Sequence, residues 1–229
     1  MNKLYDAWRF ASIAYEKPTG KERLFQGAVE FIPMETELDF GFIVRYPNRL
    51  IFSFRGTGDF KTRRGLKAWR GNIDTYPLEQ GNTIHNGFYD AWRPYKVTID
   101  GYLNYLIRKK SLVIPTSEFY GQSRGGTTCT LGARHVAKNR KMPCTGISYG
   151  SPAVGIKAFR NEFNMLPIDF TRVINGYDFA QHVPFRSLGF RHVGKYYWLY
   201  QPFYHRYFCK IYDHIPKNYT KALLKLNDK

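Results

Sequence analysis

Apolar residues along this chain follow the two spacings that are typical of buried strands and of amphipathic helices. Residues 50–54 are almost wholly apolar, as expected of a strand that is covered on both faces of a sheet. Further strands are predicted at 40–46, 118–120, 144–149 and 170–174. Helices are predicted at 3–15, 87–105, 157–163 and 216–229, with one more that follows the glycine-rich turn after 118–120 and ends near residue 139. Strands that alternate with helices in this way predict an α/β fold with a mostly parallel central sheet flanked by helices. No linker or repeat divides the chain, so we expect one domain over 1–229.

The composition is both strongly basic and rich in apolar residues. Lysine and arginine number 35 against 18 aspartate and glutamate, a net charge of +17, and 43% of the residues are hydrophobic. A disordered chain is excluded, because disorder requires a shortage of apolar residues as well as charge. The charge predicts an anionic partner, which could be nucleic acid, lipid headgroups or an acidic protein.

Several classes of protein are excluded by what the chain lacks. No segment approaches the ~18 apolar residues of a membrane-spanning helix, and residues 1–18 have no apolar signal-peptide core. The three cysteines, Cys129, Cys144 and Cys209, are too scattered for a disulfide framework. Metal-ligand spacings, a Walker loop and a dinucleotide fingerprint are all missing, so we expect no metal and no cofactor. These features predict a reduced protein that is cytoplasmic or released by a non-classical route, and they leave its oligomeric state open.

The sharpest chemical signal is Gly-Gln-Ser-Arg-Gly at 121–125, between a predicted strand and a predicted helix. In this context G-x-S-x-G is typical of a nucleophile elbow, which exposes a serine hydroxyl above the edge of a sheet. A Cβ atom at Gly121 or Gly125 would collide with neighbouring backbone at so sharp a turn. Ser123 is therefore the candidate nucleophile. An acid and then a histidine are expected to follow it along the chain.

An aspartate and several histidines could complete such a site. Asp178 follows the strand predicted at 170–174, so it lies at the strand end where the sites of α/β proteins gather. Without further support, an aspartate in that position is more commonly a turn or cap residue. His85 and His135 precede the acid, and His182 is too close along the chain to face it. The remaining candidates for the base are His192, His205 and His214.

Five segments in order along the chain resemble motifs of the class 3 lipases, the fungal-lipase-like branch of the α/β-hydrolases. These segments are 50–57, 84–88, 121–125, 149–155 and 172–178. The resemblance covers about residues 5–220. It implies an α/β-hydrolase fold and a serine carboxylic-ester hydrolase, a lipase or phospholipase, that cleaves acyl esters of lipids through an acyl-enzyme intermediate.

The resemblance also implies a role for individual residues. Asp178 corresponds to the acid, and His214 lies in a segment similar to the late Asp-His motif that carries the base. His192 resembles a histidine beside the acid loop that is not catalytic, so it is the second candidate, with His205 behind it. The oxyanion hole would be formed by two backbone N–H groups, those of Thr57 and Arg124.

The elbow departs from the family pattern at two positions. The family usually has Gly-His-Ser-Leu-Gly, whereas this chain has Gln122 and Arg124 around Ser123. Gln122 keeps a side chain that forms hydrogen bonds. The guanidinium of Arg124 could favour an anionic substituent on the substrate, or it could turn outward into a salt bridge. Substrate preference among triacylglycerols, phospholipids and soluble esters therefore stays open.

Two further segments bear on how a substrate is reached. Residues 58–71 carry five cations and an apolar component, and the corresponding interval in the resembling lipases is a movable lid. A basic amphipathic lid would suit docking on an anionic phospholipid surface, and a solvated basic loop is the alternative. Residues 196–212 hold nine aromatic residues, for most of which we expect core and edge packing.

A second hypothesis is a catalytically inactive hydrolase-like scaffold that binds nucleic acid or an anionic membrane through its basic surface. Cations interleaved with aromatic residues at 204–210 are typical of proteins that bind single strands. However, the cations are spread along the chain and no nucleic-acid-binding signature appears. We therefore expect a lipid or other acyl-ester substrate, transient contact with an anionic membrane surface, and no nucleic-acid partner.

Overall fold

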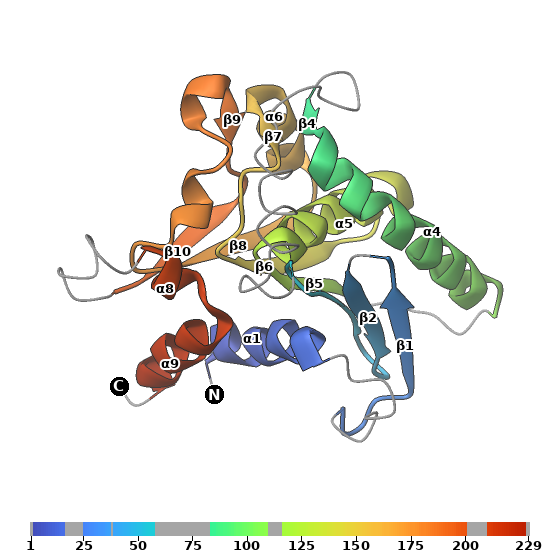
Figure 1. The fold of residues 1–229 in the computed structure, drawn as a ribbon. Helices are drawn as coiled ribbons and strands as arrows, with labels where there is room; N and C mark the ends of the chain where they lie inside the picture. The colour runs from blue at the N-terminus through green and yellow to red at the C-terminus, as the bar shows by residue number, and fades with distance from the viewer. Residues whose placement is uncertain are drawn as a thin grey trace.

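A computed structural model describes residues 2–16, 25–37, 39–57, 83–109, 116–200 and 210–227. Its main feature is a seven-stranded sheet in the order β1-β2-β3-β5-β6-β8-β10 (Figure 1). The strands are β1 (Glu30–Glu35), β2 (Phe40–Arg45), β3 (Leu50–Phe54), β5 (Ser117–Gln122), β6 (Cys144–Tyr149), β8 (Ile168–Asn175) and β10 (Lys195–Leu199). The lid-like segment 58–71, His205 and Cys209 lie outside the described residues.

Strand direction brings the ends of several strands to one edge of the sheet. The pairs β1–β2 and β2–β3 are antiparallel, and from β3 to β10 every neighbouring pair is parallel. In this register Phe54 pairs with Gly121, and Gln122 pairs with Tyr149. Because the strands run in the same direction, the segments that follow β3, β5, β6 and β8 meet at the same edge. This edge is where the candidate site lies.

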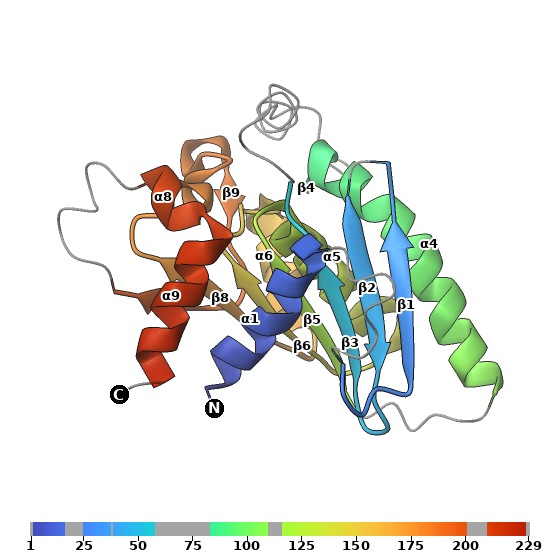
Figure 2. The same cartoon turned by 60° about the horizontal axis from the view of Figure 1, so that its bottom comes forward.

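Helices cover both faces of the sheet, as Figures 1 and 2 show. On one face lie α1 (Lys3–Ile13) and α9 (Pro216–Asn227), which are joined by a 2.8 Å hydrogen bond from Trp8 Nε1 to Thr220 Oγ1. The other face packs against α4 (Asn86–Arg108), α5 (Arg124–Arg140) and α6 (Lys157–Met165). The apolar side chains of the sheet are therefore buried on both faces, which explains why β3 is almost wholly apolar.

Short elements lie beyond the edge of the main sheet. A three-stranded antiparallel sheet consists of β4 (Ile84–His85), β7 (Gly155–Ile156) and β9 (Phe190–Arg191). The remaining elements are the 3₁₀ helices η1 (Ala14–Glu16), η3 (Phe179–His182) and η4 (Arg186–Leu188), and the short helix α8 (Lys210–His214). No helix in the described part of the chain combines the length and the apolar content that crossing a bilayer requires.

The α/β fold class and the mostly parallel sheet are confirmed. The strands that were not predicted are those in which the pattern of apolar and polar residues is weak. Both outermost strands, β1 and β10, escaped prediction. β1 contains Pro33, which an edge strand tolerates because one of its sides needs no hydrogen bond. In β10 the aromatic side chains are exposed at the edge of the sheet, with Tyr196 at 66% and Trp198 at 57%.

Candidate functional site

The serine of the elbow has a positive φ angle, which residues other than glycine rarely adopt. Ser123 lies between β5 and α5 with φ 57° and ψ −127°, and its N–H donates to the Tyr149 carbonyl at 2.9 Å. A Cβ atom at Gly121 would lie 2.2 Å from the Gly125 carbonyl oxygen, and one at Gly125 would lie 2.2 Å from the Phe54 carbonyl oxygen. The predicted need for glycine on both sides of the serine is therefore confirmed.

A continuous series of hydrogen bonds runs from this serine to Asp178. His214 Nε2 lies 2.8 Å from Ser123 Oγ, and His214 Nδ1 lies 2.9 Å from both carboxylate oxygens of Asp178. All three residues are buried, with exposed fractions of 2% or less. Because an ionised carboxylate only accepts, Nδ1 carries the proton, and Nε2 of the neutral ring accepts from the serine hydroxyl. The fold thus brings together residues that lie 91 and 36 positions apart.

The Asp178 carboxylate has two further donors, one of which the sequence did not reveal. Oδ1 accepts from the Ala180 N–H at 2.8 Å, and Oδ2 accepts from the Tyr219 hydroxyl at 2.6 Å. Burial, and then the charge of Asp178, raise the pKa of Tyr219 well above its ordinary value, so the phenol stays protonated and donates. In the sequence Tyr219 follows the segment that resembles the late Asp-His motif and lies in the helix predicted at 216–229, but neither feature predicts this hydrogen bond.

Gly150 provides the space that this cluster occupies. It has φ +53°, and a Cβ atom there would lie 2.2 Å from Asp178 Oδ2, 2.8 Å from the Tyr219 hydroxyl and 3.1 Å from His214 Nδ1. The backbone of the segment that follows β6 therefore forms one wall of the site. Its glycine is required by this close approach as well as by its left-handed conformation.

The segment that carries His214 is held by hydrogen bonds at the ends of two strands, β5 and β8. Gln122 Nε2 donates to the His214 carbonyl at 2.9 Å, and Asn175 Nδ2 donates to the Asp213 carbonyl at 2.9 Å. The buried carboxylate of Asp213 accepts from the Tyr177 N–H at 2.9 Å. The expectation that Gln122 keeps a hydrogen-bonding side chain is confirmed, and its acceptor is the main chain of the histidine itself.

The segment after β3 lies against the nucleophile. A Cβ atom at Gly56 would lie 2.9 Å from the Cβ of Ser123, so the backbone that leads to Thr57 passes beside the serine. The Thr57 hydroxyl is buried, and the described part of the chain supplies no hydrogen-bond partner for it. Arg124 is the first residue of α5, where the helix itself supplies no acceptor for the backbone N–H. The backbone of Gly56 and the first residue of α5 thus lie beside the serine, and Thr57 directly follows Gly56.

The side chain of Arg124 is engaged in a buried salt bridge. Its Nη2 lies 2.5 Å from Asp39 Oδ2, and the exposed fractions of the two side chains are 8% and 7%. Of the two expectations for this guanidinium, the structure has the salt bridge, but the bridge lies inside the protein and is not turned outward. The other oxygen, Asp39 Oδ1, finds no partner among the described residues.

Replacing Asp39 with alanine is expected to lower the free energy of unfolding by about 3–5 kcal/mol, because it leaves the buried Arg124 charge unpaired. Urea denaturation measures the change. The control is Asp90→Ala, which removes an exposed pair with Arg93 and should cost no more than about 1 kcal/mol. Equal effects of the two substitutions would contradict a structural role for the buried pair.

The other histidines lie in different surroundings. His192 Nε2 donates to the Gln181 carbonyl at 2.7 Å, and burial together with the charge of Arg172 lowers its pKa to about 4. His135 is paired with Asp100 on the far side of the sheet from α1. In the part of the chain that the structure describes, no hydrogen bond joins His192 to the serine, and no cluster of three metal-ligating side chains occurs.

Comparison with known proteins settles the family. The family model described as lipase (class 3) matches residues 51–188, which is more than half of the chain. The chain belongs to the class 3 lipases. It is accordingly a hydrolase of lipid esters, and nothing in the match supports the alternative of an inactive scaffold that binds nucleic acid.

Solved structures with the same fold are fungal triacylglycerol lipases and related proteins. One, described as a triacylglycerol lipase whose catalytic centre is formed by a serine-protease triad, has 20% identity and a TM-score of 0.71 and covers 87% of this chain and 80% of its own. The Rhizomucor miehei triacylglyceride lipase has 19% identity and a TM-score of 0.68, with 85% and 78% covered. A lipase from Rhizopus microsporus var. chinensis has 20% identity and a TM-score of 0.68, with 87% and 75% covered. These likenesses confirm the α/β-hydrolase fold.

Proposed function

We propose that Ser123, His214 and Asp178 act as a catalytic triad in a carboxylic-ester hydrolase of acyl lipids. The observation that carries this proposal is the pair of hydrogen bonds made by His214, with Nε2 at 2.8 Å from Ser123 Oγ and Nδ1 at 2.9 Å from Asp178. The conformation of Ser123 at the elbow supports the same role, because it aims the hydroxyl away from the strand and toward the imidazole.

Each step of an acyl-enzyme reaction has a group to perform it. Ser123 Oγ attacks the ester carbonyl while His214 Nε2 takes its proton, and the resulting imidazolium is stabilised by Asp178. His214 then protonates the leaving alcohol as the tetrahedral intermediate collapses to the acyl-enzyme. Water, deprotonated by the same imidazole, attacks the acyl carbonyl, and the proton returns to Ser123 as the carboxylic acid is released.

The negative oxygen of the intermediate would be bound by the N–H groups of Thr57 and Arg124. The unpartnered Thr57 hydroxyl supports a third donor at this place. One such donor typically lowers the barrier by about 3 kcal/mol. The salt bridge with Asp39 would contribute by holding Arg124, and hence its N–H, in position.

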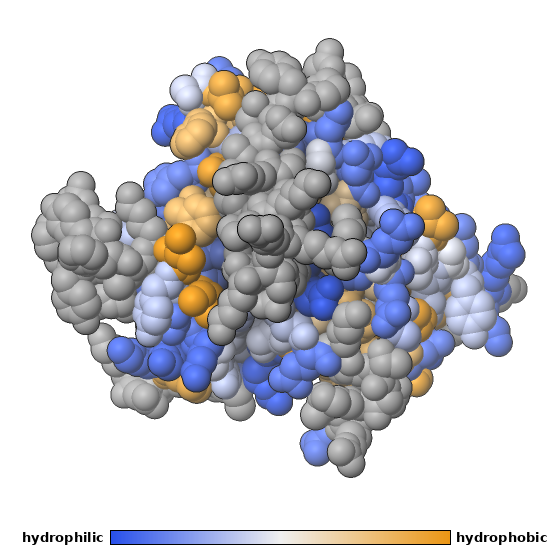
Figure 3. Space-filling model, viewed as in Figure 1, coloured by the Kyte–Doolittle hydropathy of each residue, from blue (hydrophilic) through white to orange (hydrophobic). Residues whose placement is uncertain are grey.

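Exposed apolar side chains lie on the segments that carry the acid and the base. Figure 3 shows a mostly hydrophilic face with small hydrophobic patches on the side where β9 and α8 lie in Figure 1. The exposed apolar residues of these segments are Phe185, Leu188, Ile211 and Ile215. We propose that they contact the acyl chain, and that the net charge of +17 favours transient contact with an anionic membrane.

A fluorophosphonate probe tests the proposed nucleophile directly, because it phosphonylates an activated serine and leaves unactivated hydroxyls intact. We expect one label per chain, located at Ser123 by peptide mass spectrometry. Labelling at another serine, or no labelling of the folded protein, would contradict the proposal.

Replacing Tyr219 with phenylalanine tests its part as a positioning residue. The change removes one hydrogen bond to the Asp178 carboxylate, so kcat is expected to fall about 10-fold or more with little change in KM. The matched control is Tyr149→Phe, which removes a buried hydroxyl that donates to the Leu4 carbonyl at 2.5 Å and does not contact the triad. Both variants should lose stability in urea, and only Tyr219→Phe should lose kcat. Equal kcat values would show that Tyr219 acts through stability alone.

A further inference from the structure

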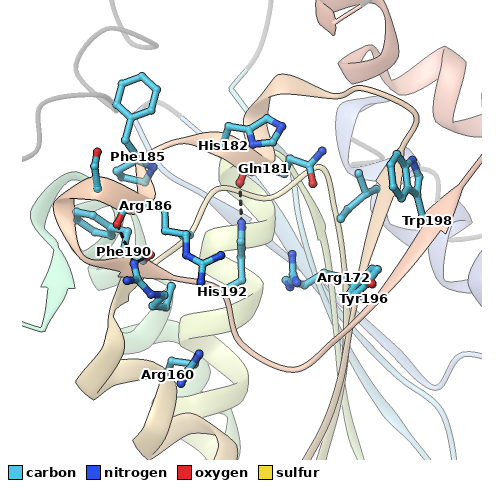
Figure 4. A pocket seen from close by; sticks show the side chains of 15 residues that line it. Arg160, Arg172, Gln181, His182, Phe185, Arg186, Phe190, His192, Tyr196 and Trp198 are labelled. Carbon is cyan, nitrogen blue, oxygen red and sulfur yellow. Dashed lines mark hydrogen bonds between the residues drawn. The ribbon is translucent and has the colours of Figure 1, made fainter. Parts of the chain in front are cut away.

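A strongly basic cavity of about 720 Å³ lies beside the segment that follows Asp178 (Figure 4). Its walls come from α6, β8, η3, η4, β9 and β10, and none of Ser123, Asp178 and His214 lines it. We propose that this cavity binds the phosphate group of a ligand. The proposal concerns binding alone, so it stands independently of the catalytic roles proposed above.

Arginine side chains dominate the charge of the cavity. Four arginines line it, Arg160, Arg172, Arg186 and Arg191, and no aspartate or glutamate is among the described residues that line it. Among the described residues none of the four forms a salt bridge, whereas Arg45, Arg124, Arg134 and Arg140 each pair with an acid. These arginines come from four separate elements and have no acidic partner in the described part of the chain. Such an arrangement is typical of an anion-binding site.

Hydrogen bonds to the backbone hold two of these guanidinium groups and leave other N–H groups available. Arg172 donates from Nε to the Val193 carbonyl at 3.0 Å. Arg191 donates from Nη1 to the carbonyls of Arg186 and Phe190 at 2.8 and 2.7 Å. The buried Nε of Arg160 has no partner among the described residues. Groups that are already fixed lose little conformational entropy on binding, which favours a tight anion site.

Two of the arginine side chains lie around the buried imidazole of His192. Figure 4 shows Arg172 and Arg186 on opposite sides of His192, whose Nε2 donates to the Gln181 carbonyl. Burial lowers the pKa of Arg172 to about 10, so this guanidinium is partly desolvated yet charged at neutral pH. Burial and Arg172 also hold the pKa of His192 at about 4, so the imidazole adds no charge of its own. An anion placed between the two guanidinium groups would supply the missing counter-charge.

The number and the spread of donors favour phosphate over a carboxylate. A carboxylate satisfies one guanidinium fork, whereas a phosphate presents three or four acceptor oxygens and close to two negative charges. On the β10 side the cavity is lined by Tyr196 and Trp198, whose exposed fractions are 66% and 57%. These exposed aromatic side chains leave room for the rest of a phosphate monoester, whether it is a small soluble molecule or a lipid headgroup.

Binding measurements on the full chain test the proposal. Inorganic phosphate and glycerol 3-phosphate are titrated by calorimetry, and sedimentation is measured with phosphatidylcholine vesicles that do or do not contain phosphatidic acid. The test variants are Arg186→Gln, whose side chain is exposed, and the double variant Arg160→Gln/Arg186→Gln. Lys221→Gln, an exposed cation on α9, removes the same charge outside the cavity and is the control.

We expect Kd to rise about 10-fold for each arginine removed and to stay within about 2-fold for Lys221→Gln. If inorganic phosphate or glycerol 3-phosphate binds saturably and the arginine variants weaken that binding, the site takes a soluble phosphate. Binding only to phosphatidic acid vesicles, weakened by the same variants, identifies a lipid headgroup as the source. The proposal is overturned if no phosphate binds in either form, or if Lys221→Gln weakens binding as much as the arginine variants do.

Discussion

Turnover of a short p-nitrophenyl ester is expected to fall by about four orders of magnitude or more when Ser123 is replaced by alanine. The substitution removes the hydroxyl that is proposed to form the acyl-enzyme, while the donors proposed on Thr57 and Arg124 remain. The low rate that remains in Ser123→Ala is expected to come from direct attack of water on the bound ester. Initial rates at saturating and at low ester concentrations measure kcat and kcat/KM separately.

Ser148→Ala is the matched control for this experiment. Ser148 is fully buried in β6, and its hydroxyl has no hydrogen-bond partner in the described part of the chain, so its removal leaves the site intact. We expect Ser148→Ala to retain most of the wild-type kcat. Turnover that is unchanged in Ser123→Ala would remove Ser123 from the role proposed for it.

The second large effect concerns the base. His214→Ala is expected to lower kcat by about four orders of magnitude, because it removes the imidazole that is proposed to take the proton from Ser123. His192→Ala is the comparison, since His192 was the second candidate for the base and its Nε2 donates to the Gln181 carbonyl. This variant should change kcat by less than about 10-fold.

A double variant separates loss of the base from a general loss of structure. Ser123 and His214 are proposed to act as a unit, so Ser123→Ala/His214→Ala should be no slower than either single variant. Circular dichroism and urea denaturation check that all variants fold. A kcat that collapses in His192→Ala while His214→Ala stays active would assign the base to the other histidine.

The parts of the fold that could be predicted are those with a local signature. The strands at 50–54 and 144–149 were predicted with the bounds that the structure has, because proline and glycine residues lie close to both ends of each segment and 50–54 is in addition almost wholly apolar. The elbow at 121–125 was recognisable because the glycines around Ser123 are required by contacts within the same turn. Strands β1 and β10 were not predicted, because an edge strand is covered on fewer sides and its side-chain pattern is correspondingly weak.

The site itself could be predicted only in part. Three histidines remained as candidates for the base, and only the resemblance to the class 3 lipases favoured His214, because no local pattern shows which histidine contacts Ser123. The hydrogen bonds from Gln122 and Asn175 to the segment of His214 join residues that are 92 and 38 positions apart, and no local pattern encodes them. No role was predicted for Tyr219 for the same reason, since a tyrosine on an amphipathic helix is ordinarily part of the core.

The sequence by itself determined the α/β class, the elbow around Ser123 and the resemblance to the class 3 lipases, because each depends on residue types within one turn or one strand. Only the tertiary structure decided which histidine lies against Ser123, that Arg124 is paired with Asp39, and that four arginines surround one cavity. These outcomes depend on contacts between distant segments, which form only when the parallel strands bring their ends to one edge and the helices pack on both faces of the sheet.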